Sequence, residues 1–418
     1  MSDPQFDARY RLTPPERVSP GVRKRSRAVA HQQTALQQDL THRPAGMDWF
    51  EEALARPAGD WDGPLVGVYC GMVPPELVRA AGARPVRLDC GNAALVPTGD
   101  EVFSGEICPL AKSSLAMLLD PESVARRAAA LVLPASCDAK TKLGEVLADF
   151  APTFTLALPR EQDAGRHAAA MAEELDRLAG FLADHLPKRP RRRALLREIE
   201  RSREQTRLVR ALQAARIEAP GALSIRDFHL IVQAALAGAD PDQWERRTRA
   251  VLAEAEGYTE DRARLRPRLV LTGAPMLWPN FKALNLIEES GADIVADTLC
   301  SGAQSLFDPV VVDERGWTAL LRALALRYVF ASPCPCFVSQ ATRMSRVLDL
   351  VRDARADGVV NYGLRLCQLF DFEAYRLQRV LKDRRIPFLN LRTDYSLEDT
   401  EQLRVRLEAF LETVEDAS

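Results

Sequence analysis

Most of the eight cysteines in this chain lie where an apolar, strand-like run gives way to a turn. They are Cys70, Cys108, Cys137, Cys300, Cys334, Cys336 and Cys367. A cysteine that only fills a core usually falls inside a helix or strand, where it acts as a small apolar side chain. Side chains at the ends of parallel strands instead converge in one crevice. This placement indicates a soft metal centre with thiolate ligands, and iron–sulfur chemistry fits it best.

Three other chemistries lack the residues that they need. The chain has only five histidines, none near the cysteine turns, which argues against a histidine-based zinc hydrolase or a Ser/His/Asp triad. Neither a GxxxxGK(S/T) nor a GxGxxG motif occurs, so nucleotide hydrolysis is not expected on this chain. The cysteines also lack the paired CxxC spacing of zinc knuckles.

Length, charge and hydropathy narrow the class of protein. A chain of 418 residues predicts two or three domains. A net charge of -2 gives no general attraction to nucleic acid or to membranes, and no apolar run reaches the length of a membrane span. The polar N-terminus and these features predict a cytoplasmic protein. In that reducing compartment, cysteines favour metal binding or catalysis over disulfides.

Two stretches alternate between strand-like and helix-like patterns and must position the cysteines. The first has expected strands at residues 65–69, 83–88, 129–133 and 154–158, and the second has them at 269–271, 294–296, 359–362 and 387–391. Residues 161–256 between them are rich in Ala, Leu, Glu and Arg at helical spacing. We therefore predict an α/β fold with two Rossmann-like parallel-sheet domains, an inserted helical segment and a polar N-terminal arm.

The predicted domain boundaries follow these changes of pattern. An N-terminal arm and helix occupy residues 1–60, and the first α/β domain occupies 61–160. The helical insertion occupies 161–262, and the second α/β domain occupies 263–418. Strand ends of the two α/β halves could face a shared cleft, which suits a cofactor held between them.

Cys108, Cys137 and Cys367 come from three separate turns. A [4Fe–4S] cluster that keeps one iron open for chemistry needs three thiolates from such turns. Pro109 fixes the loop after Cys108. Lys140 and Lys142, which follow Cys137, could offset the negative charge of a thiolate-bound cluster.

A second set of candidate ligands comprises Cys70, Cys300, Cys334 and Cys336. In an extended run, side chains two residues apart point to the same face, so the last two of these could enter one crevice or share a buried strand face. Cys90 has little beyond its position to recommend it, and we interpret it as structural. Glu76 is a weak catalytic candidate, because a carboxylate at a helix start is also a favourable partner of the helix dipole.

Several spaced motifs resemble the 2-hydroxyacyl-CoA dehydratase/benzoyl-CoA reductase superfamily. They are YCGMVPPEL at residues 69–77, AAGARPV at 80–86, CPLAKS at 108–113, CDAKTK at 137–142, DGVV at 357–360 leading into Cys367, IPFL at 386–389 leading into DYS at 394–396, and QLRVRLEAF at 402–410. The resemblance runs from about Gly63 to Glu412 and is weakest in the helical middle.

The resemblance implies a set of ligands. Cys108, Cys137 and Cys367 match the three cysteines that bind the catalytic [4Fe–4S] cluster in dehydratase subunits. The remaining cysteines resemble the double-cubane cluster branch, in which two cubes joined by a sulfide form an [8Fe–9S] cluster with six irons left for protein thiolates. Three of these six would come from Cys70, Cys300, Cys334 and Cys336. That branch usually has Cys-His-Thr-Tyr where this chain has CQLF at residues 367–370, which weakens the assignment to the branch but not to the iron ligands.

The resemblance also implies a function and partners. The expected protein is an iron–sulfur enzyme subunit, dehydratase-like or reductase-like, that performs low-potential one-electron reduction of an acyl-CoA. A separate ATP-dependent activator iron–sulfur protein would supply the electron, and the subunit would form a homodimer or a heterodimer with a sister subunit. Two alternatives remain open: a non-catalytic electron-transfer subunit, and a double-cubane reductase of a small molecule.

Overall fold

The chain forms two four-stranded parallel sheets, as the alternating pattern predicts. The structure is a computed structural model that describes residues 20–34, 42–103, 105–120, 122–259 and 266–417. The strand orders are β2-β1-β3-β4 in the first sheet and β6-β5-β7-β8 in the second, so both sheets have the same topology. The strand that comes first in the sequence of each sheet, β1 or β5, is not at the edge. The next strand pairs with one side of it, and the third strand pairs with the other side. The α/β fold class is therefore confirmed.

The first half is built from short buried strands joined by helices. Its strands are β1 (Leu65–Val68), β2 (Arg84–Arg87), β3 (Ala128–Pro134) and β4 (Thr153–Leu156). Its helices are α4 (Pro75–Ala80), η1 (Ala93–Leu95), α5 (Val96–Asp100), α6 (Pro109–Leu119), η2 (Val124–Arg127) and α7 (Asp138–Leu147). β1 and the second half of β3 are apolar and buried, as expected of parallel strands that helices cover on both faces.

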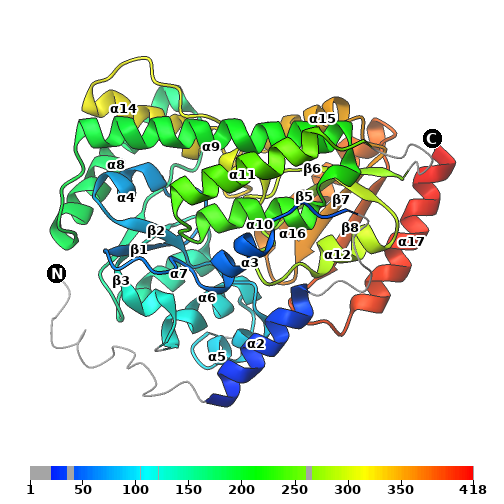
Figure 1. Ribbon diagram of the computed structural model, residues 1–418, viewed down its shortest axis with the longest axis horizontal. Helices are drawn as coiled ribbons and strands as arrows, with labels where there is room; N and C mark the ends of the chain where they lie inside the picture. The colour runs from blue at the N-terminus through cyan, green and yellow to red at the C-terminus, as the bar shows by residue number, and fades with distance from the viewer. Residues whose placement is uncertain (1–19, 35–41, 104, 121, 260–265, 418) are drawn as a thin grey trace.

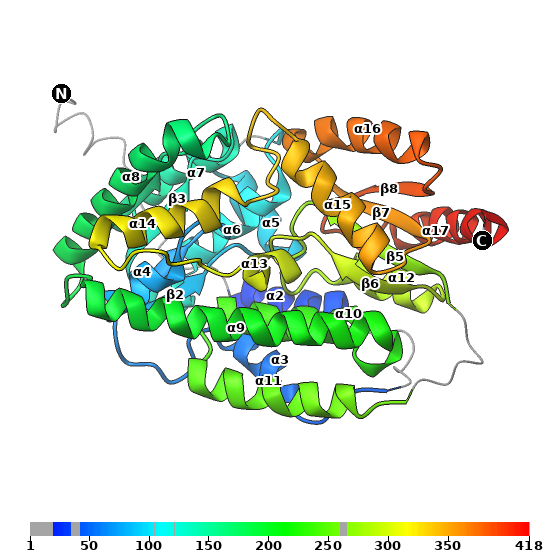
Figure 2. The ribbon, with the colours of Figure 1, turned by 90° about the horizontal axis from the view of Figure 1, so that it is seen from above.

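Helices alone occupy the described residues between β4 and the second sheet, as the Ala/Leu/Glu/Arg spacing predicts. They are α8 (Ala164–His185), α9 (Arg192–Glu218), η3 (Pro220–Ala222), α10 (Ile225–Leu236) and α11 (Pro241–Glu256). The long helix α9 runs along both halves of the molecule in Figures 1 and 2. It packs against α4 in the first half and against β6 in the second, and so ties the two sheets together.

The second half repeats the construction of the first. Its strands are β5 (Arg268–Gly273), β6 (Asp293–Asp297), β7 (Gly358–Leu364) and β8 (Phe388–Thr393). Its helices are α12 (Lys282–Glu289), α13 (Ala303–Phe307), α14 (Trp317–Ala325), the π-helix η4 (Leu326–Phe330), α15 (Ala341–Asp353), α16 (Gln368–Asp383) and α17 (Thr400–Ala417). α14 crosses to the first half and packs against α8, so the chain interlocks the two halves (Figure 2).

The described helix of the predicted polar N-terminal arm packs on the rest of the chain. Helix α2 (Pro20–Thr34) contacts η1 and α12. The buried amide of Gln33 donates to the carbonyl oxygens of Gly91 and Tyr395, both at 3.2 Å, and accepts from the backbone N–H of Ala93. The rest of the predicted arm, residues 1–19 and 35–41, lies outside the described residues. A second N-terminal helix, α3 (Asp48–Ala55), packs on α10.

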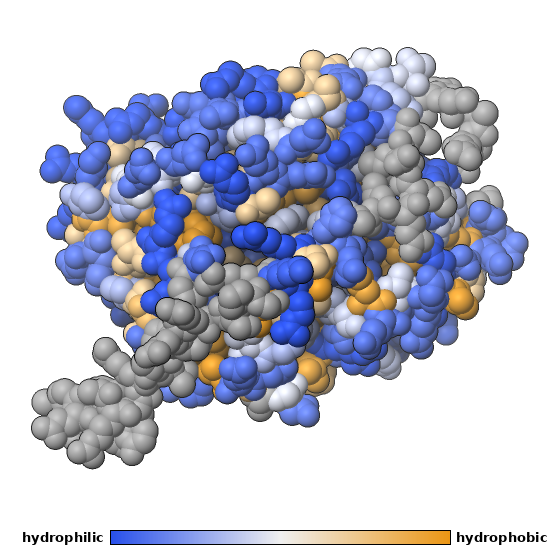
Figure 3. Space-filling view, turned by 60° about the horizontal axis from the view of Figure 1, so that its bottom comes forward, coloured by the Kyte–Doolittle hydropathy of each residue, from blue (hydrophilic) through white to orange (hydrophobic). Residues whose placement is uncertain are grey.

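No helix in the described part of the chain is long and apolar enough to cross a membrane. The face shown in Figure 3 is mostly hydrophilic, with hydrophobic side chains in scattered patches. The apolar residues instead fill the interior, where the largest cluster joins α10, α12, α17 and the second sheet.

A buried carboxylate in this interior predicts a pH-dependent stability. Glu288 accepts the backbone N–H of Ile225 at 2.8 Å, but its Oε2 has no hydrogen-bond partner. Burial raises the pKa of Glu288 to about 7. Because this pKa lies above the value in the unfolded chain, the folded state binds the extra proton, and the resulting stability is complete below about pH 4.5 and lost as the pH rises through about 7.

We therefore expect E288Q to gain stability relative to the wild type as the pH rises from 5 to 8. The gain is at most about 3 kcal/mol, because one pKa unit corresponds to about 1.4 kcal/mol. Thermal unfolding at both pH values measures it. The exposed Glu256 supplies the control, since E256Q should follow the wild type at every pH. An E288Q difference that does not change with pH would contradict the prediction.

Candidate metal centre

Six of the eight cysteines line one cavity between the two halves. They are Cys70, Cys108, Cys137, Cys300, Cys334 and Cys367. Four of them follow the carboxyl ends of β1, β3, β6 and β7, where ligands of open parallel sheets are usually held. The parallel strands therefore bring together side chains that lie up to 297 residues apart in the sequence, between Cys70 and Cys367.

Three of these cysteines share a local structure. Cys108, Cys137 and Cys367 each occupy the N-cap position of a helix, α6, α7 and α16 respectively. Backbone N–H groups in the first turns of these helices lower the pKa of each thiol, in part against the effect of burial. A helix N-terminus favours negative charge, so these positions offset part of the cost of burying a thiolate.

The other three cysteines do not occupy helix N-cap positions. Cys70 has a φ of 113°, a conformation that costs a non-glycine residue on the order of 1–3 kcal/mol. The next residue, Gly71, lies beside the other half, and a Cβ there would make an ordinary contact with the carbonyl oxygen of Cys300 at 3.5 Å. The turn therefore places Cys70 close to Cys300. Cys334 lies in the segment between η4 and α15.

The turn that carries Cys300 is held by a buried carboxylate. Asp297 accepts the backbone N–H groups of Leu299 at 2.8 Å and Ala303 at 3.2 Å, which flank Cys300. His229 lies 3.4 Å from the other carboxylate oxygen. A Cβ at Gly302 would come within 2.5 Å of both side chains, so only glycine fits this turn. Asp297, His229 and Gly302 therefore fix the shape of the turn that carries Cys300.

Cys336 and Cys90 are not among the residues that line the cavity. Cys336 contacts Cys334 and packs with Tyr328 and Phe337 in an apolar cluster. The chain turns at Pro335 and Cys336, so the alternation of an extended strand does not apply and only Cys334 reaches the cavity. Cys90 is buried against Leu95 and Ala116, in agreement with a structural role.

Burial makes the cavity thiols weak acids, although the cations Lys140 and Arg87 lie close to several of them. Burial raises the pKa of Cys70 and Cys367 to about 12 and also raises that of Cys108, Cys137 and Cys300. The pKa of Cys334 is also raised, first by its hydrogen bond with Cys336 and second by burial. Only the thiolate ligates metal, so binding here requires a strongly cationic group and releases protons.

Three charged side chains form a buried network on the cavity wall. Lys140 lies 2.6 Å from one carboxylate oxygen of Asp89, and Arg87 lies 3.0 Å from the other. Arg87 also donates to the carbonyl oxygen of Cys300 at 2.8 Å. Lys140 and Arg87 outweigh the effect of burial and hold the pKa of Asp89 below its ordinary value. Lys142, by contrast, is exposed and pairs with Glu145.

The π-helix η4 supplies two further cavity residues, Arg327 and Tyr328. Single π-helical turns occur frequently at functional sites. The Tyr328 hydroxyl donates to Glu76 at 2.8 Å. Glu76 is fully buried, its Oε2 has no hydrogen-bond partner, and it reaches the cavity only through Tyr328. Arg343 from α15 also lines the cavity and forms an ion pair with the buried Glu373 at 2.5 Å.

This donor set fits an iron–sulfur group better than a single metal ion. Within the described ranges, no three His, Cys, Asp or Glu side chains converge as the ligands of one ion would. Thiolates of a cluster bind different iron atoms and therefore stand around it. The cavity holds about 110 Å³, which is below the roughly 300–1,000 Å³ of ordinary ligand pockets. Its size suits a compact inorganic group.

Sequence reasoning did not find four of the charged or polar residues on this wall: Arg87, Asp89, Arg327 and Arg343. One signal was available, because Arg87 and Asp89 stand two residues apart at the end of an expected strand and so point to the same side. Arg343 lies in a helix whose pattern is ordinary for a surface helix, and nothing in the sequence singles it out.

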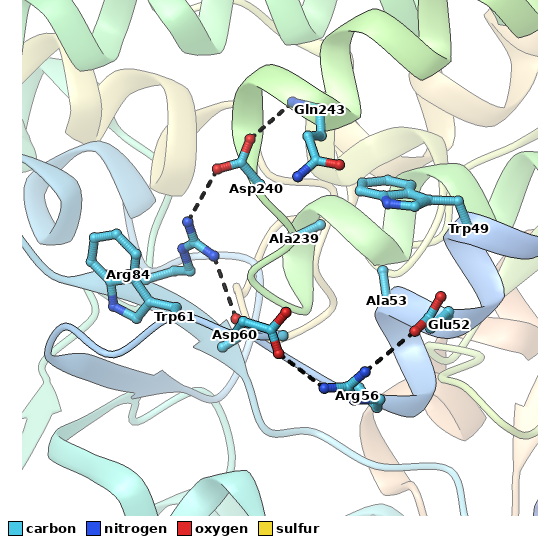
Figure 4. A pocket seen from close by; sticks show the side chains of 12 residues that line it. Trp49, Glu52, Ala53, Arg56, Asp60, Trp61, Arg84, Ala239, Asp240 and Gln243 are labelled. Atoms are coloured by element: carbon cyan, nitrogen blue, oxygen red, sulfur yellow. Dashed lines mark hydrogen bonds and ion pairs between the residues drawn. The ribbon is translucent and has the colours of Figure 1, made fainter.

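A second pocket contains none of the candidate site residues proposed from the sequence. Trp49, Trp61 and Arg84 form part of its wall (Figure 4). Its charged groups pair with one another: Arg84 with Asp240 at 3.4 Å, and Arg56 with both Glu52 and Asp60. Arg84 also lies over the ring of Trp61 at 4.3 Å. The charged side chains named here therefore already have partners within the pocket wall, and we assign the pocket no function.

Comparison with known proteins gives the relationship of the chain. Residues 70–414 match the family described as 2-hydroxyglutaryl-CoA dehydratase, D-component. The Escherichia coli (strain K12) protein named "Putative dehydratase subunit YjiM" is 30% identical over 356 residues, which cover 84% of this chain and 91% of that protein. The matched residues include all six cysteines of the cavity. The chain therefore belongs to the 2-hydroxyglutaryl-CoA dehydratase D-component family.

Proposed function

We propose that this chain is an iron–sulfur subunit of a dehydratase-like or reductase-like enzyme and that its six-cysteine cavity holds a double-cubane [8Fe–9S] cluster. The observation that supports the proposal is the gathering of six thiols from both halves on one cavity wall. Six is the number of protein thiolates that such a cluster requires by the ligand count given above. When bound, the cluster would supply low-potential one-electron chemistry.

The cavity divides naturally into two sets of three ligands. Cys108, Cys137 and Cys367 sit at three helix N-termini and would hold the first cube. Cys70, Cys300 and Cys334 act electrostatically on one another and would hold the second. Cys334 also raises the pKa of Cys137 and Cys367, so it lies close to the first set as well.

Other residues of the chain would prepare the site. The two cations Arg87 and Lys140 favour the thiolate forms and offset the negative charge of the ligands. Glu76 and Tyr328 form a hydrogen-bonded acid–base pair whose phenol lines the cavity, and they are the candidates for holding or moving a proton.

Membership of a dehydratase subunit family supports a function in a multi-protein system. We propose that a second subunit, either another copy or a sister chain, completes the enzyme and that an ATP-dependent activator iron–sulfur protein donates the electron. An acyl-CoA is the substrate class that the family name supports. The alternative is a reductase for a small molecule.

The proposal predicts a brown protein with about eight irons per chain after anaerobic purification from iron-replete cells, whereas a single cube would give about four. Iron and sulfide analysis together with EPR spectroscopy of the dithionite-reduced protein separates these cases. A change in the EPR spectrum on addition of an acyl-CoA or a small molecule would support an enzyme, and indifference to both would support a relay. Colourless, iron-free protein from such a preparation would overturn the proposal.

A further inference from the structure

Beside both sets of cysteines, the cavity wall carries a network of three charged side chains: Arg87, Asp89 and Lys140. Asp89 bridges Lys140 and Arg87, and their side chains are 1%, 12% and 5% exposed. Two cations and one carboxylate leave a net charge of +1 in a place that water scarcely reaches. A buried charge of this kind acts strongly on its neighbours, because the effective dielectric constant is low.

The network reaches both sets of cysteines. Lys140 follows Cys137 by one helical turn, so its side chain is held beside the first set, and it lowers the pKa of Cys70, Cys108 and Cys137. Arg87 contacts the turn of Cys300 through its carbonyl oxygen at 2.8 Å and lies 4.0 Å from its sulfur. Asp89 joins these two cations and thereby fixes their positions.

We propose that Arg87, Asp89 and Lys140 are positioning residues that set the reduction potential of the whole centre by holding one net positive charge between its two halves. This inference rests on the proposed function, since it concerns the cluster that the cysteines would bind. Reduction adds one electron from an external reductant, and the triad takes part through its charge without any bond being made or broken. A positive charge at this place favours the reduced form, and a carboxylate opposes it.

The sign of the effect separates this role from a merely structural one. K140M removes a positive charge at nearly constant volume and should lower the midpoint potential. D89N removes the negative charge with almost no change of shape and should raise it. The double variant K140M/D89N restores the net charge and should return the potential towards that of the wild type. If Arg87, Asp89 and Lys140 only stabilised the fold, the two single variants would not shift the midpoint potential in opposite directions.

The chain supplies matched controls on the same helix. K142M removes the charge of the exposed Lys142, which pairs with Glu145 at the surface, and should leave the potential unchanged. K140R keeps the positive charge and should stay close to the wild type. If K140M does not fold, the comparison of D89N with K140R still tests the sign expected for the carboxylate.

The experiment is an EPR-monitored redox titration of the anaerobically purified full chain with dithionite and mediators, with iron measured in every sample. Shifts of opposite sign in K140M and D89N, at equal iron content, would support the inference. Shifts of the same sign, or none, in a protein that holds its cluster would overturn it and leave the proposed function intact. An iron-free wild type would instead overturn the proposed function and this inference with it.

Discussion

Replacement of Cys108 or Cys367 by alanine is expected to remove most of the iron from the anaerobically purified protein. Each residue would supply one thiolate to the first cube, and each stands at the N-terminus of a different helix. From about eight irons per chain in the wild type, both variants should fall to a small fraction of that number, because a cube that lacks one ligand is labile. Colorimetric iron and sulfide assays measure the loss.

Cys90 provides the matched control for this experiment. It is also a buried cysteine, and burial raises its pKa to about 12, yet it lies apart from the cavity lining. C90A should therefore keep the iron and sulfide of the wild type. Circular dichroism of all variants shows whether any loss of iron comes from unfolding. Wild-type iron in folded C108A and C367A, or an equal loss in C90A, would contradict the assignment of the first cube.

The convergence of the cysteines could be predicted from the sequence because it follows from parallel-sheet geometry. Once strands and helices alternate, residues just after the strands must gather at one edge of each sheet. Cys70, Cys137, Cys300 and Cys367 obey that rule. What the alternation cannot give is strand order, and the repeated arrangement with the first strand inside each sheet became evident only from the structure.

Residues near a turn were harder to place because their direction depends on local backbone geometry. The sequence made Cys334 and Cys336 equivalent by assuming an extended run, but the chain turns there and only Cys334 lines the cavity. Similarly, Lys140 and Lys142 look alike in the sequence. The two lysines lie on different faces of helix α7, so Lys140 is buried beside Asp89 and Lys142 is exposed to solvent.

The distinction between one cube and two can be tested at the second set of cysteines. C300A and C334A are each expected to lose about half of the iron, from about eight to about four per chain, because the first cube would keep its three ligands. C336A should retain about eight, since Cys336 is not among the residues that line the cavity. C336A is a demanding control, because it removes a thiol only two residues from Cys334.

The pattern of loss distinguishes three arrangements of the ligands. A half-loss in C300A and C334A, with full iron in C336A, agrees with two cubes held by the six cavity cysteines. Full iron in all three variants would mean that only the first cube is present, as in a dehydratase subunit with a single cluster. Loss of iron in C336A would mean that this loop rearranges when it binds metal, and that Cys336 replaces one of the other thiolates. Iron analysis should be paired with EPR, because two coupled cubes and one isolated cube give different spectra even where the iron content is incomplete.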